Sequence, residues 1–154
     1  MLRTEKIFEH YCRTNQFAQG FQDITNSLPS KQGQWTEDHC WEAVIAFRLA
    51  FLYQTPYELQ AYFAQFSPII KRQKEPLRFE VDLMEASIAY LRGYHLRTYR
   101  LLTKLDRKVA DFYQPEEGKI SEMEHWAELS LLARMNNLAG KCLHRDSDHT
   151  LARI

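Results

Sequence analysis

The chain has 154 residues, about the length of one domain, and can bury a hydrophobic core without disulfide bonds. With 45% hydrophobic residues, five glycines and five prolines, its composition argues against a disordered chain, a collagen-like repeat and a turn-rich all-β fold. Lysine and arginine (20) balance aspartate and glutamate (20), so no global field attracts a polyanion or an anionic membrane. The composition favours a helical protein.

The cysteines and the apolar stretches bear on the compartment. The three cysteines, at 12, 40 and 142, are odd in number and far apart, and no apolar leader follows Met1. The longest apolar-rich stretch, 43–53, contains Arg48 and is too short to span a bilayer. We therefore expect a soluble protein in the reduced cytoplasm, with no membrane partner.

The first predicted element is a helical hairpin over 3–29. Ile7, Phe8 and Tyr11 fall at helical spacing, and so do the apolar residues from Phe17 to Leu28. Asn15 lies between the two stripes and is a poor residue for a helix interior. The sequence predicts two short amphipathic helices that meet at a corner near Asn15.

A second hairpin is expected over 36–70. Thr36 precedes an acidic first turn and is a plausible cap, and Thr55 precedes Pro56, which suits the first turn of a helix. The sequence predicts an apolar stripe along the helix after this corner, beginning at Tyr57. The pair at 67–68, Ser-Pro, is expected to end or kink it.

The second half of the chain predicts two further hairpins. The third, over 76–113, turns at Gly93. The fourth, over 119–151, follows a Pro-Glu-Glu-Gly segment and is expected to turn at Asn136 and Asn137. The four corners are then about 40 residues apart, a period typical of stacked helical pairs.

An aromatic ring follows each of the first three corners by two residues, namely Phe17, Tyr57 and His95. Because each ring precedes an amphipathic stripe, we expect Phe17 and Tyr57 to be buried wedges between paired helices. An irregular helical bundle is the alternative, since hairpins of similar length also arise from common helix and loop sizes. Either architecture is all-α and forms a single domain over 1–154.

The pattern over 4–28 and around Gly93 resembles the tetratricopeptide-like helical-repeat superfamily. The resemblance is carried by Ile7, Tyr11, Asn15, Phe17 and Gly20. It implies stacked antiparallel hairpins that serve as a protein-binding scaffold, with a concave wall formed by the first helix of each pair. Four residues at matching positions would then line a groove for a peptide: Leu49, Tyr53, Ser87 and Tyr90.

Five cations after the Gly93 corner share an arc of about 100° on an unbroken helix. They are Arg97, Arg100, Lys104, Arg107 and Lys108. We expect this basic face to bind an acidic segment of a protein partner. The alternatives are internal pairing with Glu80, Asp82 and Glu85, or a nucleic-acid surface assisted by tyrosines beside the stripe.

Motifs for catalysis and metal binding are weak. Each cysteine has a histidine within two positions, but neighbours so close on a helix point apart and cannot share a zinc ion. Glu122 and His125 form one Glu-x-x-His, where a diiron centre needs two. Neither a phosphate-binding glycine loop nor a nucleophile elbow is present.

These observations predict a non-enzymatic module without metal or cofactor. The hypothesis is an adaptor or chaperone-like subunit that binds a polypeptide partner. A nucleic-acid-associated accessory protein that uses the basic helix face is the alternative.

Overall fold

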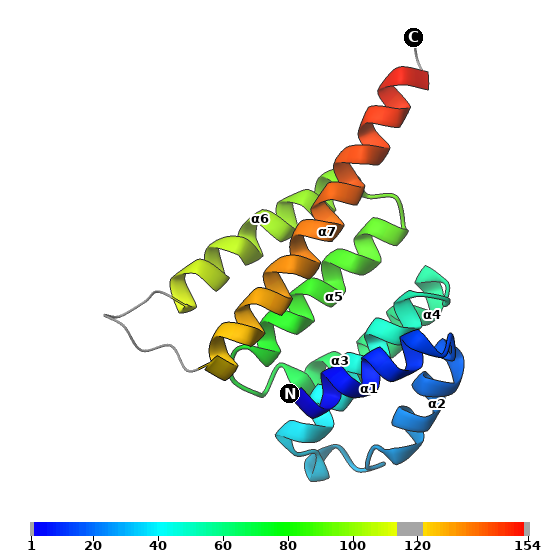
Figure 1. Ribbon diagram of the computed structural model, residues 1–154, viewed down its shortest axis with the longest axis vertical. Coiled ribbons are helices and arrows are strands. Elements are labelled where there is room, and N and C mark those ends of the chain that lie inside the picture. The colour runs from blue at the N-terminus through cyan, green and yellow to red at the C-terminus, as the bar shows by residue number, and fades with distance from the viewer. Residues whose placement is uncertain (1, 114–121, 153–154) are drawn as a thin grey trace. The chain divides into compact units, whose positions relative to one another are not determined.

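The computed structural model describes residues 2–113 and 122–152, and their side chains over 3–113 and 127–144 (Figure 1). Within these ranges all regular structure is helical, and no strand occurs. The all-α prediction is confirmed. The elements are α1 (Leu2–Arg13), α2 (Phe17–Ser27), the 3₁₀ helix η1 (Gln32–Gln34), α3 (Glu37–Phe51), α4 (Pro56–Ile70), α5 (Leu77–Leu91), α6 (His95–Phe112) and α7 (Glu122–Ala152).

Contacts within the chain divide it into two compact units, 1–81 and 82–154, and the boundary falls inside α5. The expectation of a single domain over the whole chain stays a prediction.

In the first unit, α3 is the central helix and contacts α1, α2 and α4. Its sequence is apolar on almost every side, which is typical of a helix surrounded by other elements. Nine of its 15 residues are buried, and Leu49 is completely so. The first unit thus surrounds this largely buried helix with three others.

The residues at the turns between these helices explain where the helices begin and end. Asn15 adopts a positive φ of 56°, which asparagine tolerates better than bulkier residues, and α1 and α2 meet there as predicted. Thr55 caps α4: its hydroxyl accepts from the Glu58 amide, and the Glu58 carboxylate accepts from the Thr55 amide at 3.0 Å. Thr36 and His39 form the same reciprocal arrangement at the start of α3.

The α1–α2 pair depends on Gly20, which is buried on α2. A Cβ at this position would lie 2.6 Å from Cγ of Tyr11 and 2.9 Å from Cδ1 of Leu49. Only a residue without a side chain permits this approach. The ring of Tyr11 is further fixed by its hydroxyl, which donates to Asp23 at 2.9 Å.

In the second unit, α6 contacts α7 and forms ion pairs with α5. Gly93 has a φ of +82° and ends α5, which confirms the third corner. The inner stripe of α6 consists of Thr98, Leu102, Leu105 and Val109. This spacing of three and four residues leaves the opposite side of α6 exposed.

The predicted fourth corner is wrong. Asn136 and Asn137 are exposed residues inside α7, which continues through them to Ala152. The buried residues Leu131, Met135 and Leu138 keep helical spacing across the asparagine pair. Packing of this continuous stripe overrides the poor helix propensity of asparagine. The hairpin expected over 119–151 is therefore one helix where the structure describes it.

The predicted aromatic wedges also fail in part. Tyr57 is 81% exposed, and Phe17 is half-buried. The buried face of α4 lies opposite Tyr57 and contains Leu59 and Tyr62. These two side chains also recur at helical spacing. Pro68 neither ends α4 nor prevents its last turn, which extends to Ile70.

Candidate functional site

The five predicted cations lie together on the outer side of α6. Arg97, Arg100, Lys104, Arg107 and Lys108 are all exposed, opposite the inner stripe. The 3.6-residue period that buries leucine and valine on one side thus gathers positive charge on the other. The predicted arrangement of this basic face on one helix is correct.

Two of the five cations are paired with acids of α5. Arg97 Nη2 lies 3.5 Å from Glu85 Oε1, and Lys108 Nζ lies 3.2 Å from Asp82 Oδ2. The third acid considered as an internal partner, Glu80, is buried at 4% exposure. Internal pairing therefore accounts for the two ends of the basic face.

The three cations between these ends form what we call the α6 cationic face: Arg100, Lys104 and Arg107. Over the described residues, none of the three has a hydrogen bond or an ion pair to a side chain. They occupy an arc of about 60° and span about 10 Å along the helix axis. Asp111, one turn beyond Arg107, is exposed and also forms no ion pair there. The face presents three mutually repelling, solvated charges.

Apolar side chains border the α6 cationic face at its N-terminal end. Leu96 is 63% exposed and lies one turn before Arg100. A shallow depression is lined by Gly93, Tyr94, His95, Leu96, Arg97 and Arg100. His95 Nδ1 is buried and has no hydrogen-bond partner among the described residues. Leu96 is not among the predicted site residues, and its only signal in the sequence is that it lies outside the apolar stripe of this helix.

The four predicted groove residues do not form an exposed wall. Leu49 is fully buried and Tyr90 is 7% exposed, so neither offers surface to a peptide. Ser87 is half-buried and donates to the Leu83 carbonyl at 2.7 Å. Tyr53 is exposed, at 41%. The groove prediction is wrong for Leu49 and Tyr90 because both face the interiors of their units.

The cysteines and histidines do not form a metal site within the described residues, where no group of three or more potential ligands converges. Cys40 is completely buried, and burial raises the pKa of its thiol to about 11. His39 has a different role, because its Nδ1 accepts from the Thr36 amide at 3.0 Å. The Glu122 and His125 side chains lie outside the described residues.

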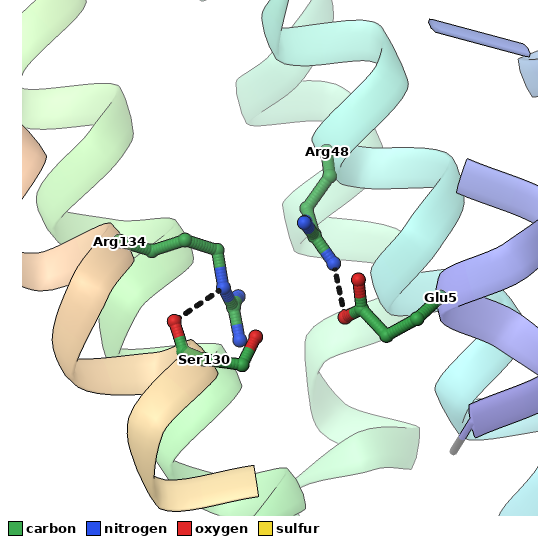
Figure 2. Close-up of polar contacts among 4 residues, drawn as sticks. All are labelled: Glu5, Arg48, Ser130 and Arg134. Atoms are coloured by element: carbon green, nitrogen blue, oxygen red, sulfur yellow. Dashed lines mark hydrogen bonds and ion pairs between the residues drawn. The ribbon is translucent and has the colours of Figure 1, made fainter. Parts of the chain in front are cut away.

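Arg48, which interrupts the apolar-rich stretch 43–53, has a structural role. Figure 2 shows Arg48 of α3, whose Nη1 lies 2.6 Å from Glu5 Oε1 of α1. The guanidinium also lies 3.9 Å from the centre of the Phe8 ring, within range of a cation–π interaction. Figure 2 also shows Arg134 of α7, whose Nε donates to the Ser130 carbonyl at 3.2 Å.

In the described part of the chain, none of the helices combines the length and apolar character required to cross a membrane. Comparison with protein-family models gives no match. Searches of curated proteins and of solved structures give no match either.

Proposed function

We propose that the chain is a non-enzymatic interaction module, an adaptor or chaperone-like subunit of the cytoplasm, that binds an acidic segment of a polypeptide partner. The observation that carries this proposal is the α6 cationic face. Three neighbouring cations are exposed without acidic partners among the described residues, although the chain has equal numbers of acidic and basic residues.

An acidic segment would lower the electrostatic energy of this face. Arg100 and Lys104 are neighbours at i and i+4, where like charges repel on a helix. Carboxylates opposite them replace this repulsion with attraction, and arginine can donate two parallel hydrogen bonds to one carboxylate. Exposed Leu96 supplies adjacent apolar area for the same segment. Because the charges are exposed, we expect salt to weaken the complex.

A nucleic-acid surface is the second candidate. Tyr94 and Tyr99 are 55% and 47% exposed, and exposed aromatic rings can stack on unpaired bases. The three cations of the α6 cationic face, on a chain of zero net charge, supply little of the phosphate neutralisation on which such binding depends. The observations therefore favour the polypeptide.

Titration of the labelled chain, followed by amide NMR shifts, tests the proposal at the level of individual residues. The ligand is a short synthetic peptide of alternating glutamate and alanine. We expect salt-sensitive shifts of the amides over 96–108, and their loss in R100E/K104E. The matched control is K31E/K74E, which makes the same charge change at two exposed residues between helices.

Two results would overturn the proposal. One is an absence of peptide-induced shifts on α6. The other is equal shifts in the wild-type chain and in R100E/K104E. Shifts on α6 produced by a single-stranded oligonucleotide, but not by the acidic peptide, would instead support the nucleic-acid candidate.

A further inference from the structure

The first helix of the chain repeats the charge pattern of α6. Arg3, Lys6, His10 and Arg13 are separated by three, four and three residues, as are four of the basic residues of α6: Arg97, Arg100, Lys104 and Arg107. On an α-helix this spacing places four side chains within an arc of about 80° and along about 15 Å of the axis. The two helices thus have matching charged faces, one in each unit.

The inner side of α1 is fixed against α3, which directs these residues outward. Thr4 is 6% exposed, Glu5 is paired with Arg48, and Phe8 lies under the same guanidinium. These contacts orient the helix about its axis. Arg3, Lys6, His10 and Arg13 lie on the other side and are all exposed.

These four residues, called here the α1 cationic face, have no acidic partner in the described part of the chain. No ion pair joins any of them to a carboxylate. Glu9 lies on the neighbouring side of α1 and forms none either. Asp23 of α2, the other nearby acid, already accepts hydrogen bonds from Tyr11 and Gln19. These two carboxylates offset the three permanent cations only in part, so among the described residues the face keeps a net positive charge.

A shallow depression lies between these cations, with an apolar floor. Its lining consists of Arg3, Lys6, Ile7, His10 and Tyr11. Ile7 and Tyr11 are half-buried, and the Tyr11 ring packs against Gly20 while its hydroxyl donates to Asp23. A bound segment would meet an ordered apolar surface bordered by positive charge.

We propose that the α1 cationic face is a second binding surface for an acidic polypeptide segment. Charge complementarity selects the occupant, because the three permanent cations and the histidine of this face outnumber the one unpaired carboxylate beside them in the described residues, that of Glu9. The floor favours a polypeptide, since Ile7 offers aliphatic area to apolar side chains and the Tyr11 ring is half-buried. The choice of an acidic polypeptide as partner rests on the proposed function. The α1 cationic face, however, belongs to the first unit, whereas α6 belongs to the second, and the two faces can be tested separately.

A chain with two such faces can hold two acidic segments. If both segments belong to one partner, the second binding event becomes intramolecular and the overall affinity exceeds that of either face. If they belong to different partners, the chain joins them. Both outcomes fit an adaptor better than a single face does.

Isothermal titration of the full chain with the glutamate–alanine peptide measures the number of binding sites. We expect two peptides per wild-type chain, one for R3E/K6E, one for R100E/K104E, and none for the quadruple variant. R3E/K6E should fold, because both side chains are exposed and an acidic residue at position 3, in the first turn of α1, interacts favourably with the helix dipole. K31E/K74E is the charge-matched control and should keep two sites.

The stoichiometry separates failure of this inference from failure of the proposed function. One peptide per wild-type chain, unchanged by R3E/K6E and lost in R100E/K104E, would overturn the second surface alone. One peptide per wild-type chain, lost in R3E/K6E and retained in R100E/K104E, would overturn the function assigned to α6 and support the α1 surface. No binding to any variant would overturn both.

Discussion

The contact between α1 and α3 and the contact between α5 and α6 use charged pairs in different environments. Arg48 and Glu5 have side chains only 17% and 16% exposed, and their charged atoms are 2.6 Å apart. Arg97 and Glu85 are 63% and 39% exposed and 3.5 Å apart. A shielded pair is strongly coupled to the fold, whereas an exposed pair contributes at most about 1 kcal/mol to stability.

This difference distinguishes cations that stabilise helix packing from cations available for binding. Arg48 is held between Glu5 and the Phe8 ring, so its loss disturbs the contact of α1 with α3. Arg100 and Lys104 contact no acid among the described residues, and their replacement removes no internal ion pair. The environment of a cation, rather than its residue type, indicates its role.

The largest expected effect comes from the core beneath the α1–α3 contact. Leu49→Ala removes a completely buried side chain that packs against Gly20, and we expect the free energy of unfolding to fall by about 2–5 kcal/mol. Tyr53→Ala, at an exposed site one turn further along the chain, should cost less than about 1 kcal/mol. Urea denaturation checks both values, and equal losses would contradict the assignment of Leu49 to the core.

The two ion-pair environments can be compared by removing one carboxylate charge from each. Glu5→Gln leaves Arg48 partly buried without its partner, and we expect a loss of about 1–3 kcal/mol in the free energy of unfolding. Asp82→Asn removes an exposed partner of Lys108 and should cost less than about 1 kcal/mol. Thermal and urea unfolding at low salt measure both. A larger loss for Asp82→Asn would reverse the comparison.

A smaller effect should appear at alkaline pH. Burial raises the pKa of the Cys40 thiol from 9.0 to about 11, so the folded chain retains this proton at pH values where the unfolded chain releases it. The resulting stabilisation is complete below pH 9.0 and is lost as the pH rises toward 11, by at most about 1.4 kcal/mol per pH unit.

Unfolding of the wild-type chain and of Cys40→Ala at pH 8 to 10 isolates this contribution, because the other titrating groups are common to both proteins. We expect the stability difference between them to shrink or reverse as the pH rises. A difference that stays constant across this range would show that the thiol pKa is not raised.

The smallest effect is expected at Tyr57. With 81% of its surface exposed, its replacement by alanine should change the free energy of unfolding by less than about 0.5 kcal/mol. Tyr62→Ala is the matched contrast on the buried side of α4, because its hydroxyl donates to the Ala43 carbonyl at 2.9 Å and its ring is in the core. A large fall in the free energy of unfolding for Tyr57→Ala would instead support the sequence-based prediction that Tyr57 is a buried wedge.

Local chemistry made three of the four corners predictable. Thr55 with Pro56 identifies the start of a helix, and Gly93 and Asn15 suit the positive φ values at their corners. The same reasoning failed at Asn136, where the continuous buried stripe of α7 outweighs the preference of asparagine for turns. The predicted buried side of α4 is also wrong. Apolar residues recur at helical spacing both on the side of Tyr57 and on the side of Leu59 and Tyr62, and the second side is the buried one.

The basic face of α6 was predictable because its five residues lie on one helix. Its division into paired and unpaired cations was not, since the pairing depends on acids of α5 that lie 12 and 26 residues away along the chain. The pairing of Arg48 with Glu5 joins residues 43 apart and has no local signal. The spacing of the basic residues of α1 is visible in the sequence, but the exposure of their side chains depends on how α1 packs against α3.

Urea unfolding of the wild-type chain and of R100E/K104E, each with and without the glutamate–alanine peptide, tests most directly whether the α6 cationic face serves binding rather than folding. We expect the two proteins without peptide to unfold within about 0.5 kcal/mol of each other. Peptide at 100 times its dissociation constant should stabilise the wild-type chain by about 2.7 kcal/mol per occupied site, and R100E/K104E by one site fewer. Equal stabilisation of both proteins, or a loss above about 1 kcal/mol in R100E/K104E without peptide, would contradict the account.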